Sequence, residues 1–513
     1  MSKPSPILSF FVSLLPALVV FSLQIPLFDQ FSTDDAFISY RYAQNLIRGQ
    51  GLVYNPGDPP VEGYTNFLWT VLLATTALSG LKLEFLGPAL SILFGIASII
   101  VLRSLLPKDL RHSSATLLTA LLPASAGFVL WSISGMETTF FVFLLLLSIR
   151  RSHIESNGRL TGYRSGFFWG LCALTRPEGI ALGPVFFLLH LLERKVTRSE
   201  IRLGLERASV FGLLVACHTG WRYSYYGAWL PNTFYAKTGS VSLLLPLGIE
   251  YTVGFVGTGA LIPLIAAIAL RPTSFGWIRH SVTWIGIMLF QIGYVILVGG
   301  DWMPGYRFYQ VILPVIPLLT AVVLSTRSEG ALREFVLLTA LPIVLALSLF
   351  AMKEQIPGST FHRIMTGKPP QPDVLKALGL HLSREYPPDT RLAVVPAGKV
   401  PYYSGFRAID MRGLCDRTIA RSRMAATEHM VAGHMKRDPA YVLSLEPDII
   451  VTSGTVRKPG IPLEPFVWRK GHFMDRWEIL DEPEFKRWYR PVRVEMSSGD
   501  KDLQFFVRRS EGS

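Results

Sequence analysis

The chain has 513 residues, of which 50% are hydrophobic and 17% charged, and its mean hydropathy is +0.35. This composition is more apolar than that of a soluble domain and indicates an integral membrane protein. The formal net charge of +13 comes from short basic groups between apolar runs, as in cytoplasmic loops, so the sequence favours no nucleic-acid partner.

The first apolar segment, residues 7–27, is long enough to cross a bilayer and is not followed by a small-residue cleavage site. We therefore expect an uncleaved membrane anchor. Further apolar segments follow at 85–104, 114–132, 136–149, 165–175, 179–192, 208–221, 246–270, 281–299, 308–325 and 334–350. Residues 1–353 are thus predicted to form a polytopic α-helical membrane domain with about 11 transmembrane helices.

Basic residues between these segments predict which loops are cytoplasmic. All basic loops lie on one side only if residues 64–80 stay at the outer face, as an interfacial or re-entrant segment. The same rule makes residues 165–192 two short helices that meet at the sequence "TRPEG". Such short helices leave their tip below the outer surface of the bilayer, which is tolerable only in a polar, water-filled cavity.

Residues 369–513 have a different character, because charged residues are frequent there. The stretches "RLAVVPAG" and "PDIIVTSG" have the pattern of buried strands, and "TIARSRMAATEHMVAGHM" between them has that of a helix. We expect a soluble α/β domain. The predicted number of crossings places this domain outside the cytoplasm, in a protein of the inner or plasma membrane.

The loops on the predicted outer side hold nearly all unusual polar groups of the membrane domain. The first of them, residues 28–84, opens with two adjacent carboxylates, Asp34 and Asp35. The other candidates for substrate binding are Arg41, Glu62, Asn66, Glu137, Arg176, Glu178, Asn232, Lys237, Asp301, Trp302 and Arg307. Ionisable groups near a bilayer are costly and therefore mark function, so their presence on one face predicts a single extracytoplasmic site.

The chemistry of this site follows from its location. Nucleotide sugars and ATP are cytoplasmic, and the chain has no phosphate-binding P-loop, so an activated substrate has to arrive in the lipid. A polyprenyl-phosphate sugar fits, because its phosphate needs a cation (Arg176, Lys237 or Arg307) and the attacking hydroxyl needs a carboxylate base (Asp34 or Asp35). Alternatively, the two acids hold a divalent cation such as Mg²⁺, Mn²⁺ or Ca²⁺.

Five motifs in one order carry a family resemblance. They are "TDDAFISYRYAQNLIRGQGLVYNPGDPPVEGYTNFLW", "SGMETTFF", "LTRPEG", "LPNTFYAKTG" and "GGDWMPGYRF". The set resembles the C-type (GT-C) integral membrane glycosyltransferases, most of all the terminal arabinofuranosyltransferase branch. The resemblance implies a catalytic acid among Asp34 and Asp35 and a polyprenyl-phosphate donor. The sugar stays open between a pentose such as arabinofuranose and a hexose, and the acceptor between a cell-envelope glycan, lipid or protein.

Each candidate also has a structural interpretation. Asp34 and Asp35 suit the first turn of an interfacial helix, where acids favour the helix dipole. For Lys237, the alternative is a side chain that extends to the membrane interface without binding a substrate. Structural ion pairs are the alternative for Arg176 with Glu178 and for Asp301 with Arg307, and turn capping is the alternative for Glu62 and Asn66. For the whole protein, the alternatives are a transporter or flippase of a lipid-linked sugar and a non-catalytic scaffold.

Overall fold

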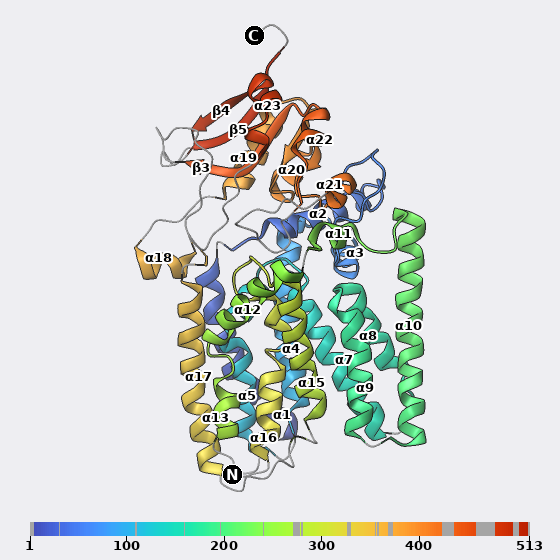
Figure 1. Ribbon diagram of the computed structural model, residues 1–513. Coiled ribbons are helices and arrows are strands. Elements are labelled where there is room, and N and C mark those ends of the chain that lie inside the picture. Colours follow the sequence, from blue (N-terminus) through green and yellow to red (C-terminus); the bar gives the residue numbers. More distant parts are fainter. Residues whose placement is uncertain are drawn as a thin grey trace.

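The structure, a computed structural model, describes residues 5–29, 31–107, 110–158, 160–194, 196–239, 241–269, 278, 281–325, 330–353, 355–356, 359–367, 373–422, 436–457, 478–495 and 502–510. It is mostly helical, with one sheet near the C-terminal end (Figure 1). The sheet lies at one end of the molecule, and the short helices α2, α3 and α11 lie between it and the long helices (Figure 1).

The helical part occupies the first two thirds of the chain. It begins with α1 (Pro6–Gln24), η1 (Ile25–Phe28), α2 (Asp34–Ile47), α3 (Phe67–Ala77), α4 (Leu83–Leu105), α5 (His112–Ala124), α6 (Ala126–Ser132), α7 (Thr138–Gly158) and α8 (Tyr163–Thr175). It continues with α9 (Glu178–Glu193), α10 (Arg198–Tyr226), α11 (Asn232–Lys237), α12 (Val241–Gly257), α13 (Ile262–Ala269), α15 (Val282–Val298), η2 (Arg307–Val311), α16 (Val315–Ser325) and α17 (Gly330–Met352).

Three helical segments of the described chain are long and apolar enough to cross a membrane: Ile7–Phe28, Leu83–Leu105 and Glu334–Met352. The number rises to five if the bent pairs α5–α6 and α12–α13 are each one span. Many large apolar side chains on these helices are exposed, as expected of surfaces that face lipid. The chain is therefore an integral membrane protein, and the count of about 11 crossings stays a prediction.

Two segments predicted as single helices are bent. Residues 114–132 divide into α5 and α6 with a 65° bend, because Ser125 between them has extended backbone. Residues 246–270 divide into α12 and α13 with a 73° bend, where Gly259 has a positive φ of 76° that favours glycine. In both places the apolar run continues through the bend, so hydropathy alone did not reveal it.

The predicted break within residues 165–192 is confirmed. Helix α8 ends at Thr175 and α9 begins at Glu178. Arg176 is extended (φ −149°, ψ 145°), as expected of a residue before proline. Within the predicted interfacial segment, α3 has 11 residues, too few to span a bilayer as a helix.

The C-terminal part contains a mixed five-stranded sheet in the order β2-β1-β3-β5-β4. Its elements are α18 (Thr360–Thr366), α19 (Val374–Glu385), β1 (Arg391–Val394), α20 (Lys399–Ser404), β2 (Arg407–Asp410), α21 (Arg417–Arg421), α22 (Pro439–Ser444), β3 (Ile449–Arg457), η3 (Glu478–Leu480), α23 (Pro483–Trp488), β4 (Tyr489–Glu495) and β5 (Asp502–Arg508). Strand β1 pairs in parallel with β2 and β3, and β5 is antiparallel to β3 and β4.

Of the helix predicted around residues 418–435, the structure describes only the start, as part of α21, and residues 423–435 lie outside the described chain. The predicted domain start at 369 also lies outside it.

One hydrophobic core joins the two parts of the chain, since Ile38, Tyr42 and Tyr54 of the first loop pack with Leu392 and Val400 beside the sheet. The sheet is thus attached to the first loop by a shared core as well as by the chain.

Candidate active site

The first turn of α2 carries both predicted acids, and the structure separates them. Successive residues of a helix point about 100° apart, so two adjacent side chains meet different surroundings. Asp34 faces the C-terminal part, where its Oδ2 accepts a hydrogen bond from the backbone N–H of Gly398 (2.9 Å) and its Oδ1 accepts one from that of Lys399 (2.7 Å). Both of its oxygens are therefore engaged.

Asp35 lies in a group of charged side chains from five separate segments. We call this group the charge cluster; its members are Asp35, Glu137, Arg176, Lys237, Asp301 and Arg307. Burial raises the pKa of Asp35 above its usual range, Lys237 and Arg307 oppose that shift, and the two other acids add to it. Among the described residues, the Asp35 carboxylate has neither a hydrogen-bond nor an ion-pair partner.

Lys237 ends the short helix α11 and has no such partner in the described chain either. Its side chain is solvent-exposed, and yet burial is the largest cause that lowers its pKa, with Asp35 opposing that shift. Lys237 and Asp35 therefore interact electrostatically, and neither charged group has a hydrogen-bond or ion-pair partner within the described chain.

Arg307 and Asp301 come from the loop after α15, which Gly299, Gly300 and Gly305 turn with positive φ. The Arg307 Nε and Asp301 Oδ2 atoms lie 2.7 Å apart, but they are misaligned for a hydrogen bond. Both atoms thus keep unmet hydrogen-bonding capacity although they are buried. The pair neutralises charge and leaves Arg307 able to donate to a further acceptor.

Arg176 is held more firmly. Its Nη1 lies 2.7 Å from Glu137 Oε1 and its Nε 2.5 Å from Glu178 Oε1. Asn66 donates to the other Glu137 oxygen (2.8 Å), so this network links the tip of α8 and α9 to the segment before α3. The ring of Phe308 lies 5.4 Å from the Arg176 guanidinium and 5.3 Å from that of Arg307, so these two cations of the charge cluster contact one aromatic ring.

The other predicted binding residues lie apart from the charge cluster and connect segments. Arg41 is buried and donates to the backbone oxygens of Phe406 (2.7 Å) and Pro401. Asn232 donates to the backbone oxygens of the loop after β2, and Glu62 forms an ion pair with Arg222 (2.5 Å). Trp302 is 43% exposed. These contacts join segments of the fold, and substrate binding by Arg41, Glu62 and Asn232 stays a prediction.

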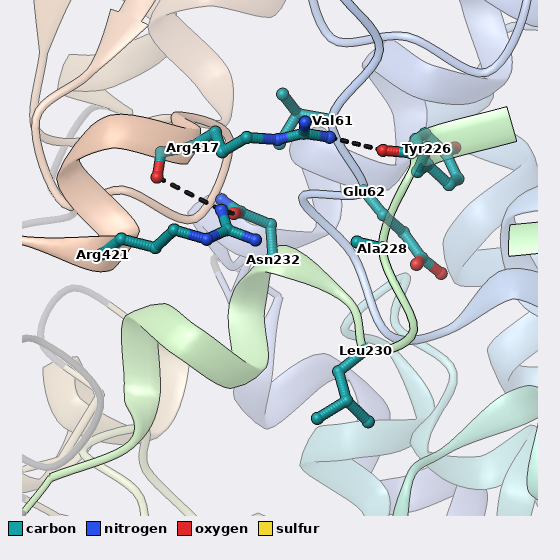
Figure 2. A pocket seen from close by; sticks show the side chains of 8 residues that line it. All are labelled: Val61, Glu62, Tyr226, Ala228, Leu230, Asn232, Arg417 and Arg421. Carbon is teal, nitrogen blue, oxygen red and sulfur yellow. Dashed lines mark hydrogen bonds between the residues drawn. The ribbon is translucent and has the colours of Figure 1, made fainter. Parts of the chain in front are cut away.

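Glu62 and Asn232 also line a small pocket at the boundary with the sheet (Figure 2). Arg417 and Arg421 of α21 close it from the C-terminal side, where Arg417 donates to the Tyr226 oxygen and Arg421 to Asn232 Oδ1 (3.3 Å) (Figure 2). No member of the charge cluster lines this pocket. It is therefore a separate feature from the charge cluster.

A divalent cation shared by Asp34 and Asp35 stays a prediction, and the described residues bring few further ligands to it. Such a cation needs several converging oxygen ligands. Both Asp34 oxygens accept backbone N–H groups, and the nearest charges that stabilise Asp35 are cations. Within the described part of the chain, no three His, Cys, Asp or Glu side chains come together as a metal site.

Gly398 and Lys399 are functional candidates that the sequence did not single out. They follow β1 in "RLAVVPAGK", and a glycine four residues after the end of a buried strand was the available signal. The Lys399 Nζ donates to the Ser32 oxygen (3.0 Å) and pairs with Asp373 (2.7 Å). The loop after β1 therefore binds the residues on both sides of the helix start.

These features define a helical integral membrane protein that also has a mixed sheet. The charge cluster includes Asp35, which lies in the first loop, and this loop packs against the sheet. Residues 367–506 match a family described as a domain of unknown function (DUF8728). The chain is 30% identical over 329 residues to a terminal beta-(1->2)-arabinofuranosyltransferase of Corynebacterium glutamicum, covering 55% of this chain and 47% of that protein. It is 25% identical over 254 residues to the Mycobacterium tuberculosis protein of the same name, covering 46% and 40%.

The likeness to these relatives confirms the resemblance that the motifs predicted. The match spans less than half the length of each relative. Among solved structures, the chain is similar to ArnT from Cupriavidus metallidurans, bound to undecaprenyl phosphate or in the apo state. Each of the two alignments covers 78% of this chain and 85% of the ArnT chain, with a TM-score of 0.48. The sequence identity is 14% for the bound structure and 15% for the apo structure. At this TM-score the likeness does not define a shared function.

Proposed function

We propose that this protein is a membrane glycosyltransferase that moves a sugar from a polyprenyl-phosphate donor to a hydroxyl of a cell-envelope glycan, lipid or protein. The observation that carries the proposal is the environment of Asp35, whose carboxylate has no hydrogen-bond or ion-pair partner in the described chain and is stabilised electrostatically by Lys237 and Arg307. A carboxylate base and cations for a phosphate are the groups that such a transfer requires.

In this mechanism Asp35 accepts the proton of the acceptor hydroxyl while the hydroxyl oxygen forms a bond to the anomeric carbon. The bond from that carbon to the donor phosphate oxygen breaks, and its electron pair leaves with the polyprenyl phosphate. Lys237 and Arg307 stabilise the charge on the departing phosphate. The raised pKa of Asp35 suits this role, because a base works best when its pKa lies near the working pH.

The relatives make a pentose such as arabinofuranose our first candidate for the donor sugar, and a hexose is the alternative. We place the site and the C-terminal domain on the extracytoplasmic face, with about 11 helices crossing the membrane. Support for this orientation comes from the distribution of basic residues in the sequence. In this orientation, the polar groups of the charge cluster come from loops on the opposite side to those bases.

The test uses full-length protein purified in detergent, polyprenyl-phosphate pentose and hexose donors, and short glycan acceptors. The variant Asp35→Asn removes the base, and Asp58→Asn is its matched control in the same loop, since Asp58 pairs with Arg407 (2.7 Å) away from the charge cluster. We expect transfer from one donor, lost in Asp35→Asn and kept in the control. Saturable donor binding without transfer would instead favour a transporter or flippase.

A further inference from the structure

The loop after β1 makes an unusually close contact with the start of α2. A Cβ atom added to Gly398 would lie 1.8 Å from the backbone oxygen of Asp34 and 2.9 Å from its Cγ. Real Cβ atoms do not approach other atoms so closely, so only glycine fits at this position. The contact brings two segments together that are 364 residues apart in sequence.

The location of this contact within the sheet is also informative. Strand β1 lies between two parallel partners, β2 and β3, and the loop at its carboxyl end carries Gly398 and Lys399. In sheets with parallel strands, this end of a central strand is where ligands bind. Here the Asp34 carboxylate lies there and accepts both backbone N–H groups.

The contact holds the helix start from more than one direction. Lys399 Nζ donates to the Ser32 oxygen, two residues before Asp34. Farther along the first loop, the Tyr54 hydroxyl donates to the Ala397 oxygen (2.7 Å), one residue before Gly398. Because Asp35 follows Asp34 in the first helical turn, fixing Asp34 also fixes the direction of the Asp35 side chain.

We propose that Asp34, together with the backbone amides of Gly398 and Lys399, is a positioning contact that aims Asp35 at the acceptor hydroxyl. In this inference, which rests on the proposed function, the C-terminal region of unknown function contributes to catalysis by orienting the base. Hydrogen bonds from N–H groups to an ionised carboxylate are short and strong, which suits this role. A reacting group displaced by about 1 Å costs roughly 100-fold in rate.

The experiment compares the kcat and donor KM of Gly398→Ala, Asp34→Asn and Asp34→Ala with those of the wild type. Gly212→Ala is the matched control, because a Cβ atom at that helical glycine meets nothing within 4 Å. We expect kcat to fall about 10- to 100-fold in Gly398→Ala and Asp34→Ala with little change in donor KM. Asp34→Asn should retain intermediate activity, because its amide oxygen still accepts one N–H group.

Binding of a polyprenyl phosphate without sugar reports whether each variant is folded, since a misfolded variant loses it. If Asp34 were the base itself, Asp34→Asn would be as inactive as Asp34→Ala, and this result would overturn the positioning role. Wild-type kcat in both Gly398→Ala and Asp34→Ala, with Asp35→Asn inactive, would overturn the inference and leave the proposed function intact. No transfer by the wild type would overturn both.

Discussion

Asp34 and Asp35 are adjacent in the chain, but one accepts two backbone hydrogen bonds from the C-terminal part and the other faces the cations Lys237 and Arg307. The two carboxylates therefore have different surroundings. One carboxylate is held in place by two hydrogen bonds from the C-terminal part. The other is bound to nothing in the described chain, which makes it the stronger candidate for chemistry.

The pH dependence of transfer should report Asp35. As a base Asp35 acts only when deprotonated, so kcat/KM should rise with pH through its pKa and level off above it. Since burial raises that pKa, the midpoint of the acidic limb should lie above the ordinary aspartate value of about 3.9. The rate of Asp35→Asn should be about 10²- to 10⁴-fold lower, and its pH profile should no longer show this acidic limb. If the acidic limb of the wild type persisted in Asp35→Asn, the limb would belong to another group.

Lys237→Met should weaken donor binding. A charge-assisted hydrogen bond to phosphate contributes about 1.5–3 kcal/mol, so the donor KM should rise about 10- to 100-fold. Lys82→Met, at an exposed lysine before α4, is the control and should leave KM unchanged. If Lys237 only reaches for the membrane interface, its variant will match the control in donor titrations.

Removal of divalent cations should not affect transfer. A divalent cation needs several converging oxygen ligands, and no group of three His, Cys, Asp or Glu side chains occurs among the described residues. We expect the same rate with and without a chelator in the assay. A rate that falls with the chelator and returns with Mg²⁺, Mn²⁺ or Ca²⁺ would show that a cation enters with the substrate.

Local features of the sequence predicted part of this structure. Pro177 restricts the residue before it, so the break at Arg176 was foreseeable from two residues. The partners of Asp34 were not, because the contact depends on a glycine 364 positions away that no periodicity connects to α2. The contacts of Asn232 could not be predicted from the sequence either. Its position in a predicted outer loop suggested sugar binding, and in the structure its amide donates to backbone oxygens of the loop after β2.

Gly63→Ala should destabilise the joint between the first loop and the C-terminal part. A Cβ atom there would lie 2.3 Å from Cys415 Sγ and 2.9 Å from the Tyr42 hydroxyl. Overpacking of this kind costs about 1–3 kcal/mol, which should lower the melting temperature of the purified protein. Adding Cys415→Ala removes the sulfur and should recover part of the loss. Equal melting temperatures of the single and double variants would show that the sulfur is not the obstacle.

Arg176 provides a test of structural against substrate-binding roles. Its guanidinium pairs with two buried acids, Glu137 and Glu178, so Arg176→Met would leave both without their cation. Breaking a buried ion pair costs about 3–5 kcal/mol, and we expect a large fall in melting temperature. The control Arg202→Met removes an arginine whose side chain is 78% exposed from its pair with Glu206, and should cost about 1 kcal/mol or less. An unchanged melting temperature with a raised donor KM would instead assign Arg176 to the phosphate, because a group needed only for substrate leaves the free protein stable.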